Sequence, residues 1–134
     1  KAINAAADKL HTQQLLAAAG LPVPKTMLAK FPVDSGFIGD MLGFPVIIKT
    51  LRGTRGGGVF LAENREQFRD LTDLLAESNP NIHFIFQEYI GTSHGADLRV
   101  FIADGRVLAC MKRVAAEGSF KSNISRGGTG TPYP

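Results

Sequence analysis

The stretch PVIIKTLRGTRGGGVFLA, residues 45–62, determines how the rest of the chain is interpreted. It contains the β-branched run Val46 to Ile48, and Lys49 follows that run at once. The next segment holds four glycines and two arginines, and a second apolar run, Val59 to Leu61, comes after it. Short apolar runs of this kind are typical of buried strands. The stretch therefore predicts two strands joined by a glycine-rich loop, with a lysine at the loop entrance.

Such a loop predicts phosphate binding. Glycine allows positive φ and lets the backbone approach a ligand closely, and successive N–H groups form an anion-binding nest. The lysine adds a positive charge at a fixed place on the preceding strand. A P-loop is excluded because no lysine follows the glycines, and a dinucleotide fingerprint is excluded because a strand follows instead of a helix. A flexible hairpin loop with a solvated lysine is the alternative interpretation.

Composition indicates a globular chain. Of its 134 residues, 44% are hydrophobic and 20% are charged, which is the usual range for soluble domains. The net charge of +3 does not by itself argue for nucleic acid, and no direct nucleic-acid contact is expected. No apolar run approaches the roughly 20 residues that span a bilayer, and no signal peptide is recognised, so we expect no membrane contact and a cytoplasmic location.

Before the glycine-rich loop, the chain predicts two helices and a short strand. The first helix covers residues 4–19, with Asn4 as N-cap and Gly20 at its end. Residues 25–29 form the strand. The second helix begins after Asp34 or Ser35 and ends at Gly43.

After the loop, Asn64 and Gln67 resemble a capping box, and they begin a third helix. Its expected apolar face consists of Phe68, Leu71, Leu74 and Leu75. A strand follows over residues 82–89. Residues 97–103 and 106–114 alternate in polarity around Asp104-Gly105, which is a strong hairpin signal. Leu98, Val100 and Ile102 are expected on one face, and Val107, Ala109 and Met111 on one face.

The order of elements predicts an α+β fold with two lobes. Composition changes at Gly91 to Gly95, so the first lobe is expected to cover residues 1–90 and the second to begin with residues 91–134. No helix or strand pattern is visible in residues 131–134, and the chain is interpreted as a piece of a longer protein. A nucleotide is expected to bind between the lobes.

Six motifs in this order resemble those of ATP-grasp carboxylate–amine ligases, most closely the RimK-like group that adds glutamate to the C-terminus of a ribosomal protein. The motifs are Asp8-Lys9-Leu10 with Leu15-Leu16 and Gly20, residues 45–49, residues 53–59, Gln87-Glu88-Tyr89-Ile90, residues 95–99, and residues 118–123 running on to Arg126-Gly127-Gly128. The resemblance covers nearly the whole chain. It implies a partial ATP-grasp fold, with ATP as cofactor and Mg²⁺ as its metal.

The resemblance also implies roles for individual residues. Lys9 and Lys49 are expected to contact the phosphates, the glycine-rich loop to cover them, and Asp97 to accept the ribose hydroxyls. The hinge at residues 87–90 is expected to contact adenine, and residues 121–123 to face the triphosphate. The full set of expected nucleotide-binding residues is Lys9, Lys49, Gly53, Gly56, Gly57, Gly58, Gln87, Glu88, Tyr89, Ile90, Asp97, Lys121, Ser122 and Asn123. Arg113 and Arg126 are expected near the phosphates or the acceptor carboxylate, as catalytic residues.

The chain departs from this family at two places. Lys121-Ser122-Asn123 stands where Arg-Ser-Asn is usual, and a lysine lacks the guanidinium fork that grips phosphate from two directions. The Asp and Glu-x-Asn that bind magnesium in the family are not found, so the ligands of Mg²⁺ are expected beyond Pro134 and none within this chain. Two roles also have structural alternatives: Glu88 as a surface carboxylate, and Asp97 as the partner of Arg99 or a strand cap.

The implied function is the ATP-binding portion of a ligase that forms an amide through an acylphosphate. Glutamate is the expected amino acid, and the C-terminus of a ribosomal protein is a candidate acceptor. The 134-residue chain by itself is expected to lack ligase activity because the metal ligands are missing. The alternatives are a non-catalytic nucleotide-binding module and, ranked last, a ribosome-binding or nucleic-acid-binding piece, since no aromatic residues are interleaved with its basic loops.

Overall fold

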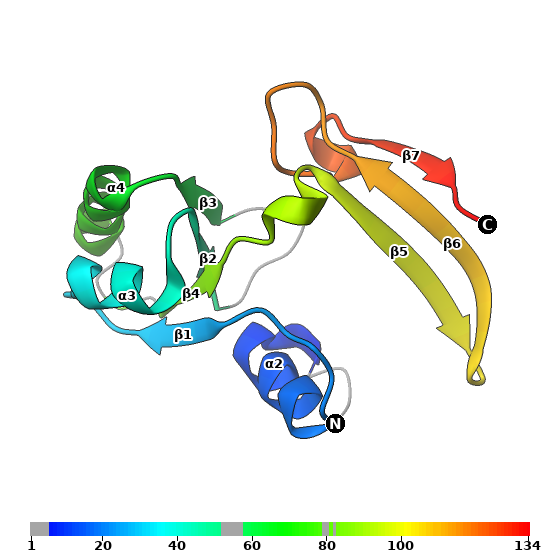
Figure 1. Cartoon of the computed structure of the whole chain (residues 1–134), viewed down its shortest axis with the longest axis horizontal. Coiled ribbons are helices and arrows are strands. Elements are labelled where there is room, and N and C mark those ends of the chain that lie inside the picture. The colour runs from blue at the N-terminus through cyan, green and yellow to red at the C-terminus, as the bar shows by residue number, and fades with distance from the viewer. Residues whose placement is uncertain (1–5, 52–57, 79–80, 82) are drawn as a thin grey trace. The chain divides into compact units, whose positions relative to one another are not determined.

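The computed structural model describes residues 6–51, 58–78, 81 and 83–134 (Figure 1). Asn4, Gly53, Gly56 and Gly57 therefore lie outside the described residues. The chain divides into two compact units, Lys1–Tyr89 and Ile90–Pro134. In the part of the chain that the structure describes, no helix is both long enough and apolar enough to cross a lipid bilayer.

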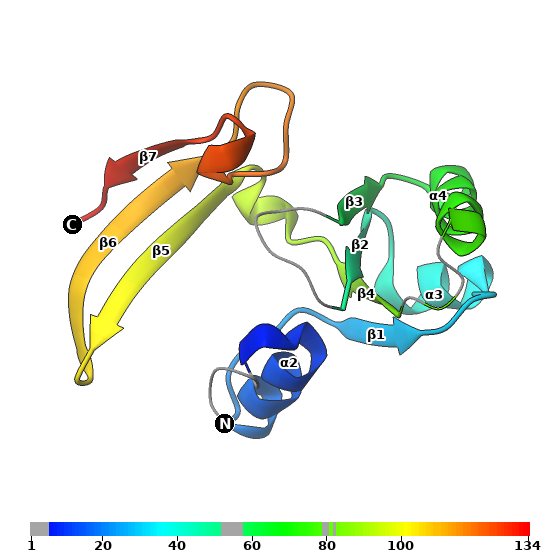
Figure 2. The ribbon, with the colours of Figure 1, turned by 180° about the vertical axis from the view of Figure 1, so that it is seen from behind.

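The first unit is built on a four-stranded antiparallel sheet with the order β1-β4-β2-β3. Its strands are β1 (Thr26–Ala29), β2 (Val46–Thr50), β3 (Val59–Ala62) and β4 (Phe84–Glu88). The predicted pair that flanks the glycine-rich loop is present as β2 and β3, with Lys49 opposite Val59. Figure 2 shows β4 between β1 and β2, so the strand that precedes the predicted hinge lies inside the sheet.

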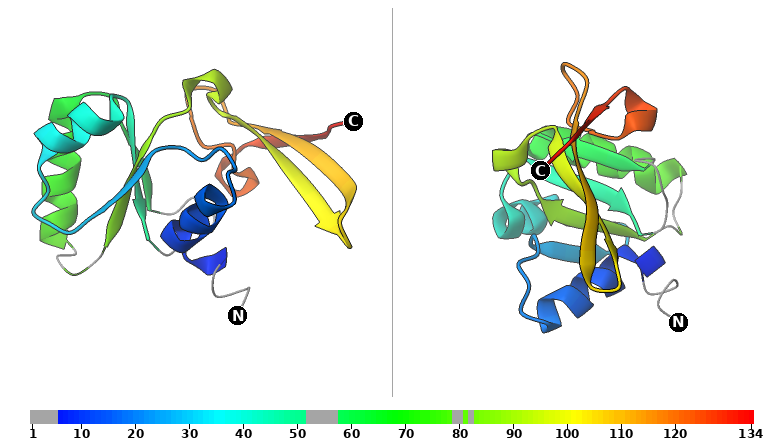
Figure 3. Two further views of the ribbon diagram at one scale, coloured as in Figure 1. Left: turned by 60° about the horizontal axis from the view of Figure 1, so that its bottom comes forward. Right: turned by 90° about the vertical axis from the view of Figure 1, so that its right-hand side faces the viewer.

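The two faces of this sheet differ. Helices α3 (Ser35–Leu42) and α4 (Arg65–Ser78) cover one face, as Figure 1 and the left view of Figure 3 show. The core that they enclose with the sheet consists of Ile38, Val46, Ile48, Ala62, Phe68, Phe84 and Phe86. Because successive residues of a strand point to opposite faces, Lys49 and Gln87 are directed to the other face. These two polar side chains of β2 and β4 therefore lie on the face away from α3 and α4.

The N-caps explain where the helices begin. α2 (Lys9–Ala18) begins after Asp8, whose carboxylate accepts the backbone N–H of His11 at 3.0 Å. Asp34 caps α3 in the same way through Phe37 N (3.0 Å). Either Asp34 or Ser35 was compatible with the sequence, and Asp34 is the cap. The predicted start of the first helix at residue 4 lies outside the described residues. Residues 6 and 7 are helical, and the predicted continuous helix is interrupted at Asp8, whose carboxylate accepts a free N–H of the first turn of α2.

At the start of α4, Asn64 Oδ1 accepts from Gln67 N at 3.0 Å, while Gln67 Oε1 accepts from Glu63 N at 2.9 Å. The predicted cap is therefore present. Its second bond differs from a regular capping box, because Gln67 accepts the N–H of Glu63 and not that of Asn64. The predicted apolar face is wrong at Leu74, which is 59% exposed. Thr72 is buried instead, because positions 68, 72 and 75 share one face of a helix with 3.6 residues per turn.

The second unit is a three-stranded antiparallel sheet, β5-β6-β7, formed by β5 (Ala96–Ala103), β6 (Arg106–Val114) and β7 (Thr129–Pro132). The β5–β6 hairpin is as predicted: Asp104 and Gly105 have φ of 49° and 69°, and two positive φ angles are the signature of a type I′ turn. β7 is not as expected, because residues 131–134 showed no strand pattern. Its pairing with β6 holds a sequence of weak strand propensity in the sheet.

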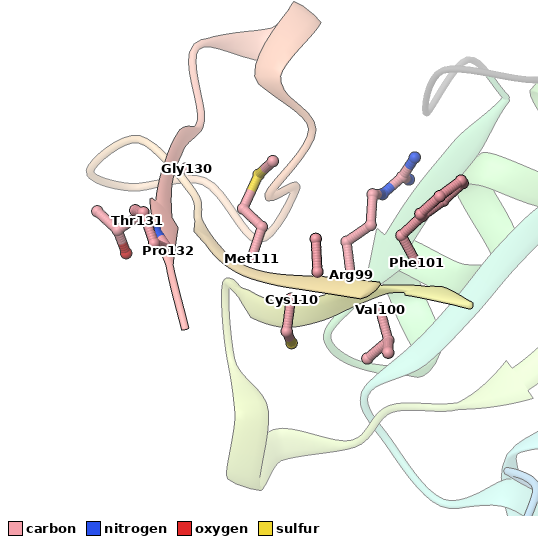
Figure 4. Close-up of a pocket in the computed structure, with 9 residues that line it drawn as sticks. Arg99, Val100, Phe101, Cys110, Met111, Gly130, Thr131 and Pro132 are labelled. Atoms are coloured by element: carbon pink, nitrogen blue, oxygen red, sulfur yellow. The ribbon is translucent and has the colours of Figure 1, made fainter. Parts of the chain in front are cut away.

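A bulge in the hairpin corrects the predicted faces. The register shifts between Phe101 and Ile102, so that Val107 pairs with Ile102 while Ala109 pairs with Phe101. Directly paired residues share a face, so Val107 and Ala109 lie on opposite faces. Figure 4 shows Arg99, Phe101 and Met111 on one side of the strands, and Val100 and Cys110 on the other. The pocket that these residues line therefore borders both faces of the sheet. We assign no ligand to this pocket.

Candidate functional site

In the first unit, two lysines from different elements lie close together. Lys49 is on β2, and Lys9 is the first residue of α2. Lys9 Nζ donates to the carbonyl oxygen of Thr50 at 3.0 Å, one residue after Lys49. The two lysines therefore lie close together in the first unit, and their binding of one ligand stays a prediction.

The charges of these lysines are costly to the fold. Burial lowers the pKa of Lys49, and the positive charge of Lys9 lowers that pKa further. Burial also lowers the pKa of Lys9, while its neighbour Asp8 acts in the opposite direction. An anion bound near both ammonium groups would offset the burial of each and the repulsion that Lys49 experiences from Lys9.

Lys49 is positioned by a neutral group. Its Nζ donates a short hydrogen bond to Gln87 Oε1 of β4, and Gln87 is only 4% exposed. Gln87 Nε2 in turn donates to the hydroxyl of Thr26 on β1 at 2.8 Å. Thr26 Oγ1 donates to the carbonyl oxygen of Pro24 at 2.9 Å. The amide thus links Lys49 to the edge strand β1 without neutralising its charge.

Gly58 is the described end of the glycine-rich loop. Its φ is +67°, and its carbonyl oxygen accepts from Thr50 N at 3.0 Å. A β carbon at this position would lie 2.7 Å from both Cγ2 and Oγ1 of Thr50. Glycine is therefore required here by its backbone angle and by the side chain opposite, and this contact fixes where the loop rejoins β3.

The predicted hinge residues continue from β4. Glu88 accepts the backbone N–H of Lys25 through Oε1 at 2.8 Å and donates its own N–H to Lys25 O at 3.0 Å. Glu88 is thus bonded to the chain just before β1, unlike a free surface carboxylate. Burial raises the pKa of Tyr89. Ile90 is 46% exposed and its carbonyl accepts from Ser93 N at 3.3 Å. Their role against adenine stays a prediction.

In the second unit, Asp97 and Arg113 form an ion pair. They face each other directly across β5 and β6. Arg113 Nε donates to Asp97 Oδ1 at 2.7 Å, and Nη2 donates to Oδ2 in a second, short bond. The Arg113 guanidinium lowers the pKa of Asp97, and the Ser122 hydroxyl adds to this effect through a hydrogen bond. The partner of Asp97 is thus Arg113 rather than Arg99.

The segment after β6 carries the other predicted residues. Asn123 precedes η2 (Ile124–Arg126), and its carbonyl oxygen accepts from Arg126 N at 2.9 Å and from Gly128 N at 3.2 Å. Lys121 Nζ lies 5.4 Å from the ring centroid of Phe120. Burial lowers the pKa of Lys121, and the charge of Arg126 lowers it further. Lys121 and Arg126 are thus a second pair of neighbouring cations, in the second unit.

Comparison with known proteins identifies the family of this chain. Residues 6–134 match the RimK-like ATP-grasp domain. The chain belongs to the RimK-like ATP-grasp family. A protein of Alkalilimnicola ehrlichii named "Probable alpha-L-glutamate ligase" is 44% identical over 128 residues, which cover 95% of this chain and 42% of that protein. A protein of the same name from Marinomonas sp. is 44% identical over 132 residues, covering 96% and 42%. The chain thus spans less than half the length of these relatives.

Solved structures show the same fold. The RimK-domain ATP-grasp protein of Sphaerobacter thermophilus has a TM-score of 0.66 and 23% identity, covering 93% of this chain and 52% of that one. The D-alanine–D-alanine ligase of Bacillus anthracis, solved with ATP, has a TM-score of 0.70 and 20% identity, covering 95% and 39%. The predicted partial ATP-grasp fold of class α+β is therefore confirmed.

The ATP-grasp residues described here do not fit a metal. Within residues 6–51, 58–78, 81 and 83–134, no group of three or more His, Cys, Asp or Glu side chains is close enough to hold an ion. The carboxylate of Asp97 accepts a hydrogen bond from Arg113, and that of Glu88 accepts one from the backbone N–H of Lys25. We therefore derive no step through magnesium from these residues.

Sequence reasoning missed two groups at the lysine site. Thr26 orients Gln87, and the carbonyl of Thr50 holds Lys9. Neither has a recognisable signal, because a threonine in a strand is ordinary and a backbone carbonyl has no sequence signature. Thr26 could have been found only from the pairing of β1 with β4, which places it opposite Gln87.

Proposed function

We propose that this chain is the nucleotide-binding portion of an ATP-dependent carboxylate–amine ligase. The proposal is carried by the lysine pair Lys9 and Lys49 near Thr50, the end of β2. The neutral amide of Gln87 accepts from Lys49. A polyanion such as the triphosphate of ATP matches two adjacent ammonium groups. Relatives of the same fold solved with ATP and with ADP support a nucleotide as the ligand.

The family resemblance implies nucleotide contacts for residues of the second unit as well. A carboxylate has about four lone-pair sites, and Arg113 with Ser122 uses three of those on Asp97. Because Asp97 is 42% exposed, its remaining site is open to a ribose hydroxyl, as predicted from the family resemblance. Lys121, whose pKa is lowered by burial and by the charge of Arg126, would face the phosphates together with Arg126.

The proposed reaction has two steps. A carboxylate oxygen of the acceptor attacks the γ-phosphorus of ATP, which forms an acylphosphate and releases ADP. The nitrogen of an amine then attacks the acyl carbon, which forms the amide and releases inorganic phosphate and a proton. Cationic groups in fixed positions stabilise the charge that develops on the transferred phosphoryl group.

Glutamate as the amine is supported by the names of the relatives, which are 42–44% identical to this chain. The C-terminus of a ribosomal protein as acceptor is supported by the resemblance to the RimK-like group. Magnesium, which would neutralise part of the triphosphate charge, is expected to have its ligands outside residues 1–134. A cytoplasmic location follows from the same proposal.

A non-catalytic nucleotide-binding module is the second candidate. It is favoured by one observation, that the described residues contain no cluster suited to a metal. The two candidates predict the same binding but different turnover by a protein that contains this chain.

The test of nucleotide binding is a calorimetric titration of the wild-type chain with ATP, ADP and AMP. A site built on two phosphate-binding lysines predicts that affinity falls from ATP to ADP to AMP, by about tenfold or more over the series. Equal affinity for all three nucleotides, or none for any, would contradict the proposal. Release of phosphate from ATP that depends on glutamate, measured in a longer protein, then separates a ligase from a binding module.

A further inference from the structure

We propose that Gln87 is a positioning residue that fixes the ammonium group of Lys49 for the triphosphate, and that Thr26 sets the orientation of Gln87. This inference rests on the proposed function, since the triphosphate is its ligand. It gives Gln87 a role other than the adenine hinge that the family resemblance implies. The argument uses only the first unit, in which all the residues lie on adjoining strands.

The first step is to establish which group donates and which accepts in each hydrogen bond. A hydroxyl has one proton, and that of Thr26 is directed to the carbonyl oxygen of Pro24 at 2.9 Å, which can only accept. Thr26 Oγ1 must therefore accept from Gln87 at 2.8 Å, and so the NH₂ group of Gln87 faces Thr26. This leaves Gln87 Oε1 for Lys49, which can only donate.

The second step is the rigidity of this arrangement. Gln87 lies on β4, directly opposite Thr26 on β1 and opposite Ile47 on β2. The register at β1 is held by Glu88, which bonds Lys25 through both its side chain and its backbone. Gln87 is 4% exposed, so water does not compete for its amide. A buried amide with both ends satisfied has one stable orientation, because a flip would leave both ends unmatched.

The third step is the consequence for Lys49. A glutamate at position 87 would neutralise the ammonium, and an apolar residue would leave it without this acceptor. The neutral amide holds Nζ in place and supports its charged form against burial and against the charge of Lys9. Lys49 thus keeps an acceptor that does not neutralise its ammonium, which leaves that charge for an anion.

The experiment measures the titration of Lys49 in the whole chain without nucleotide, by carbon-13 NMR of labelled lysine side chains assigned with Lys49→Arg. Thr26→Val keeps the shape of the side chain but removes the acceptor of Gln87. We expect its Lys49 midpoint to fall below that of the wild type, and ATP affinity at neutral pH to fall about tenfold. Thr26→Ser restores the hydroxyl and is expected to restore both values.

The matched control is Thr72→Val, which removes the hydroxyl of a threonine elsewhere in the first unit. Thr72 Oγ1 bonds the carbonyl of Phe68 at 3.0 Å on α4, on the face of the sheet away from Lys49. This variant is expected to lower thermal stability but to leave the Lys49 midpoint unchanged. An equal fall of the midpoint in both variants would mean a general effect of destabilisation, and would overturn the inference.

A second variant tests the same contact should Thr26→Val not fold. Gln87→Glu places a carboxylate at the Lys49 ammonium, so the midpoint is expected to rise and ATP affinity to fall. An unchanged midpoint in either Thr26→Val or Gln87→Glu overturns the role of Gln87. The midpoints are read without ATP, so they test the inference even in a chain that fails to bind ATP, a result that would contradict only the proposed function.

Discussion

The positive charge of Lys49 lowers the stability of the fold, and the same charge is expected to bind phosphate. Lys49 lies in a strand opposite Val59 and Ile85 of the two adjacent strands, and its pKa is lowered by burial first and by the charge of Lys9 second. A lysine whose pKa falls on folding destabilises the native state while it is charged, because the unfolded chain binds the proton more tightly. A sequence selected for stability alone would favour an apolar residue here. The retained charge is consistent with binding of an anion.

This conflict predicts how stability depends on pH. Below the lowered pKa both states are protonated and the penalty is complete, whereas above 10.5, the ordinary lysine value, both states are neutral and it vanishes. The free energy of unfolding is therefore expected to gain a rising contribution across that window. Lys49→Met should remove this contribution and be more stable than the wild type at pH 7, as measured by urea unfolding. A variant less stable than the wild type at every pH would contradict this account of Lys49.

Asp97 predicts the opposite dependence. Its pKa is lowered from 3.8, foremost by the Arg113 guanidinium. A carboxylate of this kind contributes stability that is present above pH 3.8 and is lost as the pH falls through the lowered value. Asp97→Asn should therefore lower stability at pH 6 but show a smaller further loss between pH 5 and pH 2. The control is Asp104→Asn at the hairpin turn, where asparagine also tolerates positive φ, and it should keep the acid dependence of the wild type.

Among the elements, the β2–loop–β3 unit depends on one close contact. Gly58 combines a positive φ with a neighbour that excludes a β carbon. Gly43 has a similar φ of +72°, but a β carbon there would meet no atom within 4 Å. The two glycines therefore share the conformational requirement and differ in the steric one.

Alanine variants of these two glycines form a matched pair that separates the conformational cost from the steric cost. Gly43→Ala is expected to cost about 1 kcal/mol of unfolding free energy for its backbone angle alone. Gly58→Ala should cost about 1–3 kcal/mol more, because its methyl group would overlap Thr50. Thr50→Ala in the Gly58→Ala background should recover part of the additional loss. Equal costs for the two single variants, measured by chemical denaturation, would show that Thr50 does not confine Gly58.

The sequence predicts these elements well where a local signal exists. Asp34, Asn64 and Asp104-Gly105 mark their caps and turn through side-chain and backbone chemistry that acts within a few residues. β7 and the bulge at Phe101 are set by pairing with distant strands, which no local pattern records. The lysine site follows the same rule: Lys49 is visible beside its glycines, whereas its connection through Gln87 to Thr26 depends on the strand order.

At the scale of the whole molecule, the chain carries positive charge in each of its two units. The first unit has Lys9 and Lys49, and the second has Lys121 and Arg126, with the pKa of Lys9, Lys49 and Lys121 lowered by burial. A ligand that contacts such cations stabilises the folded chain, by about 2.7 kcal/mol at a concentration of 100 Kd. ATP is therefore expected to raise the melting temperature clearly, and AMP to raise it less.

Ligase activity is a separate prediction at this scale. Because the family resemblance implies magnesium ligands that are not among the matched motifs, the 134-residue chain is expected to bind ATP but not to release phosphate from it. The assay contains ATP, magnesium, glutamate and a candidate acceptor peptide, with a longer form of the protein in parallel. Turnover by the 134-residue chain that depends on the acceptor would show that the metal site has been missed.

The most direct test of the central claim is a calorimetric comparison of ATP and AMP binding to Lys49→Met and to Lys30→Met. Lys30 is exposed and serves as the control for the loss of one positive charge. A charge-assisted hydrogen bond to phosphate contributes about 1.5–3 kcal/mol, so Lys49→Met should weaken ATP binding about 10-fold to 100-fold and AMP binding much less. Lys30→Met should bind both nucleotides like the wild type. An equal loss for ATP and AMP in Lys49→Met, or equal losses of ATP affinity in the two variants, would contradict the assignment of Lys49 to the triphosphate.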